Sequence, residues 1–495
     1  MKDLLVFAKD LAVTAPSGVQ LVSQVTLEIG RGKRIALLGA SGAGKSLLTR
    51  ALAGLLPENF TRSGLVREHL AEGQKKLRIL YLVQQAMNAW DPLVRLDTQL
   101  GEGVPDAARS KSAFREKLRT VLGELGFAEP ERILAHYPCE LSGGMLQRTM
   151  LAAAMINPPD LVIADETVGA LDAALREESL ERLDTLRKAH GTTVMLITHD
   201  LKLAANWADE LFVMDAGRLV EHGGPEILLD PHAPATRRLI AGRMLTVNAA
   251  QAHAAAAPQN ASAAPFIEVK NLTRRYRTGW RRSNTVFENL SFTLRRGEVL
   301  GLVAPSGTGK STLSRLLLGL EKPDAGSITF EGMAQQDWIS AHPGALSVVF
   351  QDYIDSLNPT MRVRDLLLEP LRILGRPLEG EAEKLISMVG LGEARLNAYA
   401  HMLSGGEAQR IALARALSAS PQFVVFDEAL SSLDAAVSGS LVALLKTLKT
   451  PDMTWLFITH DTELAAAMCD RILLMEKGAI AGELSAAELF HTRRY

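Results

Sequence analysis

The chain has 495 residues, 47% of them hydrophobic, which is enough for two or three domains that each bury a core. Its 54 basic and 56 acidic residues are nearly balanced, which argues against a broad electrostatic surface for nucleic acid or anionic lipid. The sequence shows no signal peptide, membrane-spanning run or metal-spaced cysteine cluster, and its two cysteines favour a reducing, cytoplasmic compartment.

Three short apolar runs in the first half predict strands that are buried on both faces. They are RIALLGA at 34–40, LVIAD at 161–165 and TVMLITHD at 193–200. Strands this apolar are typical of a mostly parallel sheet covered by helices, so we expect an α/β fold. Such sheets place their ligands at the carboxyl ends of the strands, where these runs carry glycine or polar residues.

The stretch GASGAGKS at 39–46 follows the first strand and matches a phosphate-binding loop. Gly39, Gly42 and Gly44 let consecutive backbone N–H groups curl around phosphate oxygens without steric clashes. We expect Lys45 to reach the β- and γ-phosphates and Ser46 to offer its hydroxyl to Mg²⁺. The positive end of the following helix would face the same anion.

Polar residues at other strand ends are candidates for metal binding and hydrolysis. We expect Asp165 to hold Mg²⁺ directly or through water, and Glu166 to orient and polarise the attacking water. His199 would contact the γ-phosphate, although a histidine in such a place is also satisfied by neighbouring backbone. Gln84 would reach Mg²⁺ or the attacking water once the nucleotide binds.

Residues 246–265, TVNAAQAHAAAAPQNASAAP, differ from the rest of the chain because half are alanine and none is an acid, lysine or arginine. Such a segment has too little apolar area to fold alone and predicts a linker. A short helix in it is compatible with its alanine content. We therefore expect one domain at 1–245 and a second at 266–495.

The second half repeats the motifs of the first in the same order. The repeated residues, each about 261–267 positions after its counterpart, are Lys310 for Lys45, Gln351 for Gln84, Ser404 for Ser142, Asp427 for Asp165 and His460 for His199. This regularity predicts a tandem duplication with a unit of roughly 240 residues. The runs at 299–304, 423–427 and 454–461 repeat the three apolar strands.

The second phosphate loop, APSGTGKS at 304–311, has Ala304 where the pattern has its first glycine. We expect a small local adjustment rather than loss of the loop, because Gly307, Gly309, Lys310 and Ser311 remain. The other expected roles also recur. They fall on Asp427 and Gln351 for Mg²⁺, Glu428 for the attacking water and His460 for the γ-phosphate.

Two further phrases, LSGGMLQR at 141–148 and LSGGEAQR at 403–410, complete the repeated set. With these motifs, both halves resemble the nucleotide-binding domains of ABC transporters over the whole chain except the linker. The resemblance implies two P-loop ATPase domains of the ABC type, each with a mostly parallel sheet core and a helical subdomain. It also implies an ATPase whose cofactors are ATP and Mg²⁺.

In this family the two domains pack head to tail and share each ATP. The resemblance therefore implies that Ser142, Gly143 and Gly144 cap the γ-phosphate held by Lys310. Likewise, Ser404, Gly405 and Gly406 would cap the one held by Lys45. Further nucleotide contacts implied by the resemblance fall on Ser41, Leu47, Ser306, Thr312 and, through adenine stacking, Tyr276. The first half has Ala15 where Tyr276 stands in the second. Since both halves keep their lysine, glutamate and histidine, we predict two hydrolytic sites.

The phrases VFQDYIDSLNP at 349–359 and DPHAPATRRLIAG at 230–242 are similar to the oligopeptide, dipeptide and nickel importers of the family. This resemblance implies a fused ATPase bound to two permease subunits at the cytoplasmic face of the inner membrane, peripheral to it. The regions at 86–130 and 353–400 would grip the permeases, and an extracytoplasmic binding protein would deliver a peptide, nickel or a metal–chelator complex. No nucleic acid is expected as a partner.

Three alternatives differ from this interpretation. A soluble tandem ATPase acting on ribosomes would carry a long, charged linker, whereas this linker is short and uncharged. The fused ATPases of sugar importers usually lack the lysine of the second phosphate loop, but Lys310 is present here. A vitamin importer is a further alternative that these motifs resemble less.

Overall fold

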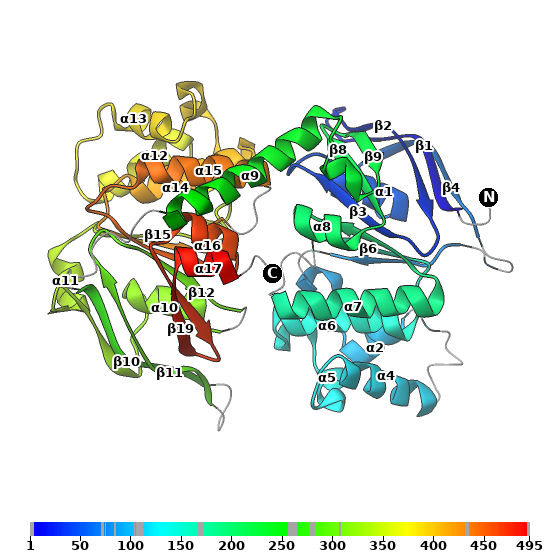
Figure 1. Ribbon diagram of the computed structural model, residues 1–495, viewed down its shortest axis with the longest axis horizontal. Helices are drawn as coiled ribbons and strands as arrows, with labels where there is room; N and C mark the ends of the chain where they lie inside the picture. Colours follow the sequence, from blue (N-terminus) through cyan, green and yellow to red (C-terminus); the bar gives the residue numbers. More distant parts are fainter. Residues whose placement is uncertain are drawn as a thin grey trace. The chain divides into compact units, whose positions relative to one another are not determined.

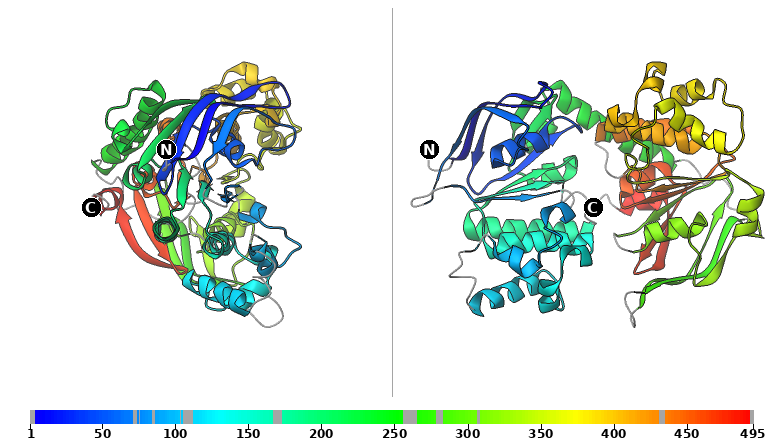
Figure 2. Two further views of the ribbon diagram at one scale, coloured as in Figure 1. Left: turned by 90° about the vertical axis from the view of Figure 1, so that its right-hand side faces the viewer. Right: turned by 180° about the vertical axis from the view of Figure 1, so that it is seen from behind.

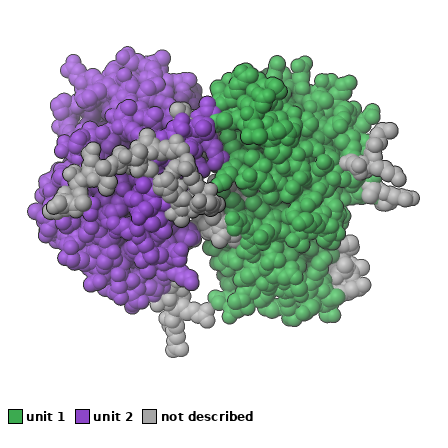
Figure 3. Space-filling view, in the orientation of Figure 1, with its two compact units in different colours: residues 1–240 green, residues 241–495 purple. Residues whose placement is uncertain are grey.

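A computed structural model describes residues 4–70, 74, 76–83, 86–102, 104, 112–166, 173–255, 265–277, 283–305, 308–430 and 435–492. The chain forms two compact units, residues 1–240 and 241–495 (Figure 3). Among the described residues, no helix combines the length and apolarity that crossing a bilayer requires.

The first unit contains an antiparallel sheet and a mostly parallel central sheet (Figure 1). The antiparallel sheet has the order β2 (Gln20–Gly30), β1 (Leu4–Thr14) and β4 (Thr61–Glu68). The central sheet has the order β5 (Ile79–Leu82), β6 (Leu161–Asp165), β7 (Thr193–Ile197), β3 (Arg34–Gly39), β8 (Glu210–Asp215) and β9 (Arg218–Gly223), with only β9 antiparallel to its neighbour.

The helices of the first unit cover both faces of this central sheet. They are α1 (Lys45–Ala53), α2 (Leu96–Gly101), α4 (Ser112–Glu124), α5 (Pro130–Ala135), α6 (Gly143–Ile156), α7 (Ala173–His190), α8 (Leu201–Trp207) and the start of α9 (Pro234–Ala255). Figure 1 shows α1 and the antiparallel sheet on one side of β6, and α6 and α7 on the other.

The second unit has the same plan. Its antiparallel sheet has the order β11 (Ser283–Arg295), β10 (Pro265–Arg277), β13 (Ala325–Phe330) and β14 (Met333–Ala334). Its central sheet has the order β15 (Leu346–Val349), β16 (Phe423–Asp427), β17 (Thr454–Thr459), β12 (Val299–Val303), β18 (Arg471–Glu476) and β19 (Ala479–Ser485). Its helices are α10 (Lys310–Leu317), α11 (Gln335–Ala341), α12 (Val363–Ile373), α13 (Glu381–Met388), α14 (Gly405–Leu417), α15 (Ala435–Leu448), α16 (Thr462–Met468) and α17 (Ala486–Thr492).

The central strands are buried on both faces, as their continuous apolar runs predict. In β6, Val162 and Ala164 join the core under α6 and α7, whereas Leu161 and Ile163 join the core around α1. Side chains alternate between the two faces of a strand, so one apolar run supplies two cores. The prediction of an α/β fold with mostly parallel sheets is confirmed in both units.

Helix α9 occupies part of the segment that the sequence predicts to be a linker. It continues to Ala255, and residues 256–264 lie outside the described part of the chain. Its beginning is held by Glu221, whose carboxylate accepts hydrogen bonds from the backbone N–H groups of His232 and Ala233. In the second unit, Ala250 is 1% exposed and packs in that unit's core. The alanine-rich composition therefore forms a helix whose small side chains permit close packing.

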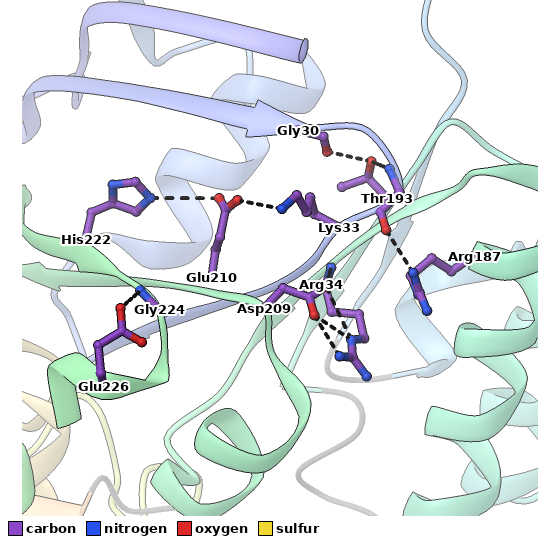
Figure 4. A network of polar contacts seen from close by, with 11 residues as sticks. Gly30, Lys33, Arg34, Arg187, Thr193, Asp209, Glu210, His222, Gly224 and Glu226 are labelled. Atoms are coloured by element: carbon purple, nitrogen blue, oxygen red, sulfur yellow. Dashed lines mark hydrogen bonds and ion pairs between the residues drawn. The ribbon is translucent and has the colours of Figure 1, made fainter. Parts of the chain in front are cut away.

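A polar network holds the amino-terminal edge of the first unit's central sheet (Figure 4). Arg34 pairs with Asp209 at 2.7 Å, and Glu210 lies 3.4 Å from the Lys33 ammonium and 3.8 Å from the His222 ring nitrogen. The side chains of Lys33 and Glu210 are 46% and 27% exposed. These contacts join β3 to β8 and β9, on the edge opposite the predicted phosphate loop.

The second unit reverses the charges of the Lys33–Glu210 pair of this network. Glu298 replaces Lys33, Arg471 replaces Glu210, and Glu483 replaces His222. Arg471 Nε lies 2.7 Å from Glu298 Oε1, and its Nη1 lies 3.2 Å from Glu483. The Arg471 and Glu298 side chains are only 14% and 5% exposed, so this pair is far less accessible to solvent than its counterpart.

We expect Glu298→Ala to destabilise the second unit by about 3 kcal/mol, because it leaves the buried Arg471 charge without its bidentate partner. Lys33→Ala should cost less than about 1 kcal/mol, because its pair is exposed. Hydrogen exchange of the amides in β12 and β18, against those in β3 and β8, measures both effects in the full chain. Equal losses of protection in the two variants would contradict this ranking.

Candidate nucleotide-binding sites

The first phosphate loop brings a buried lysine under glycine-rich backbone. Lys45 is 7% exposed, and its ammonium donates to the carbonyls of Gly39 and Ala40 at 2.8 and 2.9 Å. Gly39 has a φ of 151°, and a Cβ there would lie 2.4 Å from the Met214 carbonyl oxygen. Gly44, with a φ of 94°, turns the chain into α1. The glycines therefore serve the turn itself, and they leave the helix N-terminus accessible to an anion.

The second loop reaches the same arrangement without its first glycine. The Lys310 ammonium donates to the carbonyls of Ala304 and Pro305 at 2.9 and 3.3 Å, and Lys310 is 5% exposed. Gly309 has a φ of 93° and precedes α10; a Cβ there would lie 2.1 Å from Val286 Cγ1. Ala304 thus keeps the lysine contact that Gly39 makes in the first unit. The expected contacts at Ser306 and Gly307 lie outside the described residues.

In the first unit, two hydroxyl groups donate to the predicted metal-binding acid, and a third contacts one of these two. Asp165 Oδ1 accepts a hydrogen bond from Ser46 at 3.0 Å, and its Oδ2 accepts one from Tyr81 at 2.8 Å. Thr49 Oγ1 lies 3.1 Å from the Tyr81 hydroxyl oxygen. Burial raises the pKa of Tyr81, with the nearby Asp165 charge acting in the same direction, so its hydroxyl stays protonated as a donor.

In the second unit, a serine replaces the tyrosine as the partner of this acid. Ser314 donates to Asp427 Oδ2 at 3.1 Å. Burial raises the pKa of Asp427, and hydrogen bonds with Ser314 and Ser311 act against that rise. Asp165 and Asp427 are each 6% exposed. Each unit therefore has a carboxylate next to a phosphate-loop serine, which is a set of hard oxygen donors suited to Mg²⁺.

The glutamate after each acid has a backbone conformation that side chains rarely adopt. Glu166 and Glu428 have φ values of 53° and 51°. Their backbone N–H groups still donate to the neighbouring strand, at Ile197 and Ile458, before the chain turns away. Left-handed backbone at a non-glycine residue costs about 1 kcal/mol. The same strained conformation in both units points to a role for the side chain at this position.

Each of these glutamates lies beside the predicted histidine. Glu166 Oε1 is 4.0 Å from His199 Nδ1, and Glu428 Oε2 is 3.5 Å from His460 Nδ1. Glu428 Oε1 also lies 2.7 Å from the Lys310 ammonium. Burial alone would raise the pKa of Glu428, but His460 and Lys310 lower it to about 2. In the second unit, one carboxylate therefore joins the phosphate-loop lysine to the histidine.

The two LSGG phrases form the beginnings of α6 and α14. Ser142 and Ser404 cap these helices, and each side chain accepts a hydrogen bond from the backbone three residues on. Both serines are exposed. In the second unit, Glu407 completes a capping box with Ser404, and Arg395 Nε lies 2.8 Å from that carboxylate. Exposed helix N-termini of this kind favour a bound anion.

The remaining predicted residues vary in their surroundings. The Tyr276 ring has the Arg274 guanidinium 4.6 Å from its centroid, and its hydroxyl donates to Glu321 at 2.7 Å. Gln351 is exposed just after β15, whereas Gln84 lies outside the described residues. Ser41, Leu47 and Thr312 lie in or next to the loops as predicted from their sequence positions.

The ABC transporter family model matches this chain at residues 22–169 and 287–431, one match in each unit. The chain belongs to the ABC transporter family. As a member, it is an ATP-binding subunit that hydrolyses ATP for transport, and its tandem ATPase fold is confirmed.

Similar proteins match this ABC ATPase over nearly its whole length. The peptidoglycan transport ATP-binding protein YejF of Agrobacterium fabrum (strain C58) is 33% identical, covering 98% of this chain and 93% of that protein. An uncharacterised ABC transporter ATP-binding protein YejF of Escherichia coli (strain K12) is 32% identical over 95% and 93%. The glutathione import ATP-binding protein GsiA of the same strain is 32% identical over 93% and 82%.

Sequence reasoning missed the hydroxyl groups around the two acids. Tyr81, which pairs with β6, corresponds to Val348, which pairs with β16 in the same register. Thr49 corresponds to Ser314, because each follows the phosphate-loop lysine of its unit at the same spacing. Aligning the two halves outside their motifs would have singled out this tyrosine, because it is a polar residue in an otherwise apolar strand. The left-handed glutamates had no signal in the sequence.

The low pKa of Glu428 predicts a specific acid sensitivity of the second unit. A carboxyl group whose pKa is depressed on folding stabilises the fold above its unfolded pKa, and this contribution falls as the pH drops from about 4.5 towards about 2. Between pH 6 and pH 3.5, the stability advantage of the wild type over Glu428→Gln should shrink by about 1 kcal/mol. Hydrogen exchange of β16 and β17 in both proteins measures this, and a constant difference would contradict it.

Proposed function

We propose that this chain energises an importer, binding Mg²⁺ and ATP at two sites that both hydrolyse the nucleotide. The observation that carries the proposal is the repeated group at the carboxyl edge of each central sheet. In each unit this edge holds a buried loop lysine, an acid at a strand end, a left-handed glutamate and a histidine beside it. Parallel α/β sheets bind ligands at this edge.

Each of these groups has a distinct task in phosphoryl transfer to water. Lys45 and Lys310 would bind the phosphates, and the paired Ser46–Asp165 oxygens of the first unit would hold Mg²⁺. When bound, Mg²⁺ neutralises charge on the phosphate oxygens. Glu166 and Glu428 would accept a proton from the attacking water or orient it, a role worth about 10²–10⁴ in rate. Histidine beside the glutamate would fix the orientation of that carboxylate.

We further propose that each site is completed by the LSGG helix of the other unit. Supporting this, Ser142 and Ser404 are exposed at helix N-termini, where backbone N–H groups and hydroxyls can face a γ-phosphate. A duplicated chain would then supply both halves of both sites. Because each site needs parts of both units, ATP binding would favour their association.

The expected membrane partners are two permease subunits, which would place the chain at the cytoplasmic face of the membrane. Exposed apolar side chains flank the predicted glutamines in both units. Met87 and Leu93 are 46% and 84% exposed in the first unit, and Phe350 and Ile354 are 42% and 59% exposed in the second. Such side chains suit contact with short apolar helices of a partner.

For the cargo, a peptide-containing compound has more support than nickel or a metal chelate. Two of the similar proteins are named for peptidoglycan transport and glutathione import, and both names denote compounds with peptide bonds. The cargo would reach the permeases through an extracytoplasmic binding protein.

Single Glu166→Gln and Glu428→Gln variants should each lower transport-coupled ATP turnover by about 10²-fold or more, because each removes the carboxylate that orients water. ATPase assays on the chain assembled with its permeases measure the loss. Glu177→Gln, an exposed glutamate on α7, is the control and should leave turnover unchanged. If either variant keeps wild-type turnover, the proposal of two hydrolytic sites is wrong.

The cargo proposal predicts which loaded binding protein stimulates the assembled transporter. We expect several-fold stimulation of ATP hydrolysis by the binding protein loaded with a peptide, and none beyond the unloaded protein when it is offered nickel or a metal chelate. The measurement is phosphate release in proteoliposomes. Stimulation only by the binding protein offered nickel or the chelate would show that the peptide proposal is wrong and that the cargo is a metal or metal chelate.

A further inference from the structure

The hydroxyl of Tyr81 links helix α1 to the predicted metal-binding acid of the first unit. It donates to Asp165 Oδ2 at 2.8 Å and lies 3.1 Å from Thr49 Oγ1. Thr49 is fully buried, and its single hydroxyl proton is within reach of either the Tyr81 oxygen or the Lys45 backbone carbonyl, which lies 3.1 Å away. When Thr49 donates to Tyr81, two successive hydrogen bonds connect helix α1 through the tyrosine to Oδ2 of the acid.

In the second unit, different residues hold the corresponding acid, Asp427. Val348 pairs with β16 in the register that Tyr81 has beside β6, so no hydroxyl is available from that strand position. Ser314, in the place of Thr49, instead donates directly to Asp427 Oδ2. In both units, a hydroxyl group therefore donates to Oδ2 of the acid. This hydroxyl belongs to Tyr81 in the first unit and to Ser314 in the second.

We propose that Tyr81 is a positioning residue for the first ATP site, where its hydroxyl fixes Asp165 so that Oδ1 stays beside Ser46 for the divalent cation. This inference rests on the proposed Mg²⁺ role of Asp165. It makes cation affinity depend on a tyrosine in the first site and on a serine in the second. The two ATP sites therefore differ in the residues that support the acid, although their phosphate loops and catalytic residues correspond.

The size of the effect follows from the burial of the acid. Asp165 is only 6% exposed, so its Oδ2 would lack its protein donor without the tyrosine hydroxyl. The carboxylate would then turn to find another donor and lose its fixed orientation toward Ser46. Removing groups that orient a metal ligand typically weakens metal affinity by about 10–100-fold.

The test measures Mn²⁺ binding rather than turnover. The full chain carries Lys310→Ala to disable nucleotide binding in the second site, and Mn²⁺ is titrated by electron paramagnetic resonance in the presence of a non-hydrolysable ATP analogue. Adding Tyr81→Phe should weaken Mn²⁺ binding by about 10-fold. Tyr137→Phe, which removes the hydroxyl of a tyrosine that is 37% exposed, is the matched control and should leave the affinity unchanged. Equal or tighter binding by Tyr81→Phe would overturn the inference.

A transplant of the second unit's residues guards against a variant that misfolds. Thr49→Ser with Tyr81→Val recreates the Ser314–Val348 pair in the first unit, and should bind Mn²⁺ at least about 5-fold more tightly than Tyr81→Val alone. No gain from the added serine would also overturn the inference. Absence of Mn²⁺ binding in the parent chain with Tyr81 intact would instead contradict the proposed metal role of Asp165, so the two failures are distinguishable.

Discussion

The parallel pairing of three central strands determines where the chemical groups of each unit lie. In the first unit, β6, β7 and β3 are neighbours and run in one direction, so Asp165, His199 and the phosphate loop all follow the same edge. The strands are held there by burial on both faces, and their carboxyl ends cannot shift without moving side chains between two cores. Packing and site geometry therefore depend on the same register.

Glu166 and Glu428, which follow the acid-bearing strands, depend on this fixed register for their position. Their backbones still complete the ladder to the next strand, and only then adopt the left-handed conformation. The rigid sheet makes this local strain tolerable. In return, the side chain of Glu428 lies within reach of both Lys310 and His460. Lys310 begins α10, and Glu428 and His460 follow β16 and β17, so the parallel sheet brings together three ionisable groups that are far apart in sequence.

Much of this arrangement could be predicted from the sequence, because it depends on patterns that a single strand or loop carries by itself. The apolar runs ending in Asp165 and Asp427 indicated both the strands and their ligand-bearing ends. What could not be predicted depends on partners distant in sequence. The Tyr81–Asp165 bond joins residues 84 positions apart, and the bond from the Tyr276 hydroxyl to Glu321 joins residues 45 positions apart. Composition alone also did not show that Ala250 would pack in a core.

The ion pairs Lys33–Glu210 and Glu298–Arg471, at the amino-terminal edge of the two central sheets, have opposite charges at corresponding positions. This difference affects which hairpin can pair with which sheet. The two units share one plan, so the β8–β9 hairpin could in principle add to β12, and the β18–β19 hairpin to β3. Exchange of this kind would set Glu210 against Glu298 and Arg471 against Lys33, two like-charged pairs, one of them well shielded from water. Repulsion between such pairs is costly where solvent cannot screen it. The opposite charges of the two ion pairs therefore disfavour exchange of these hairpins between the two units of the duplicated chain.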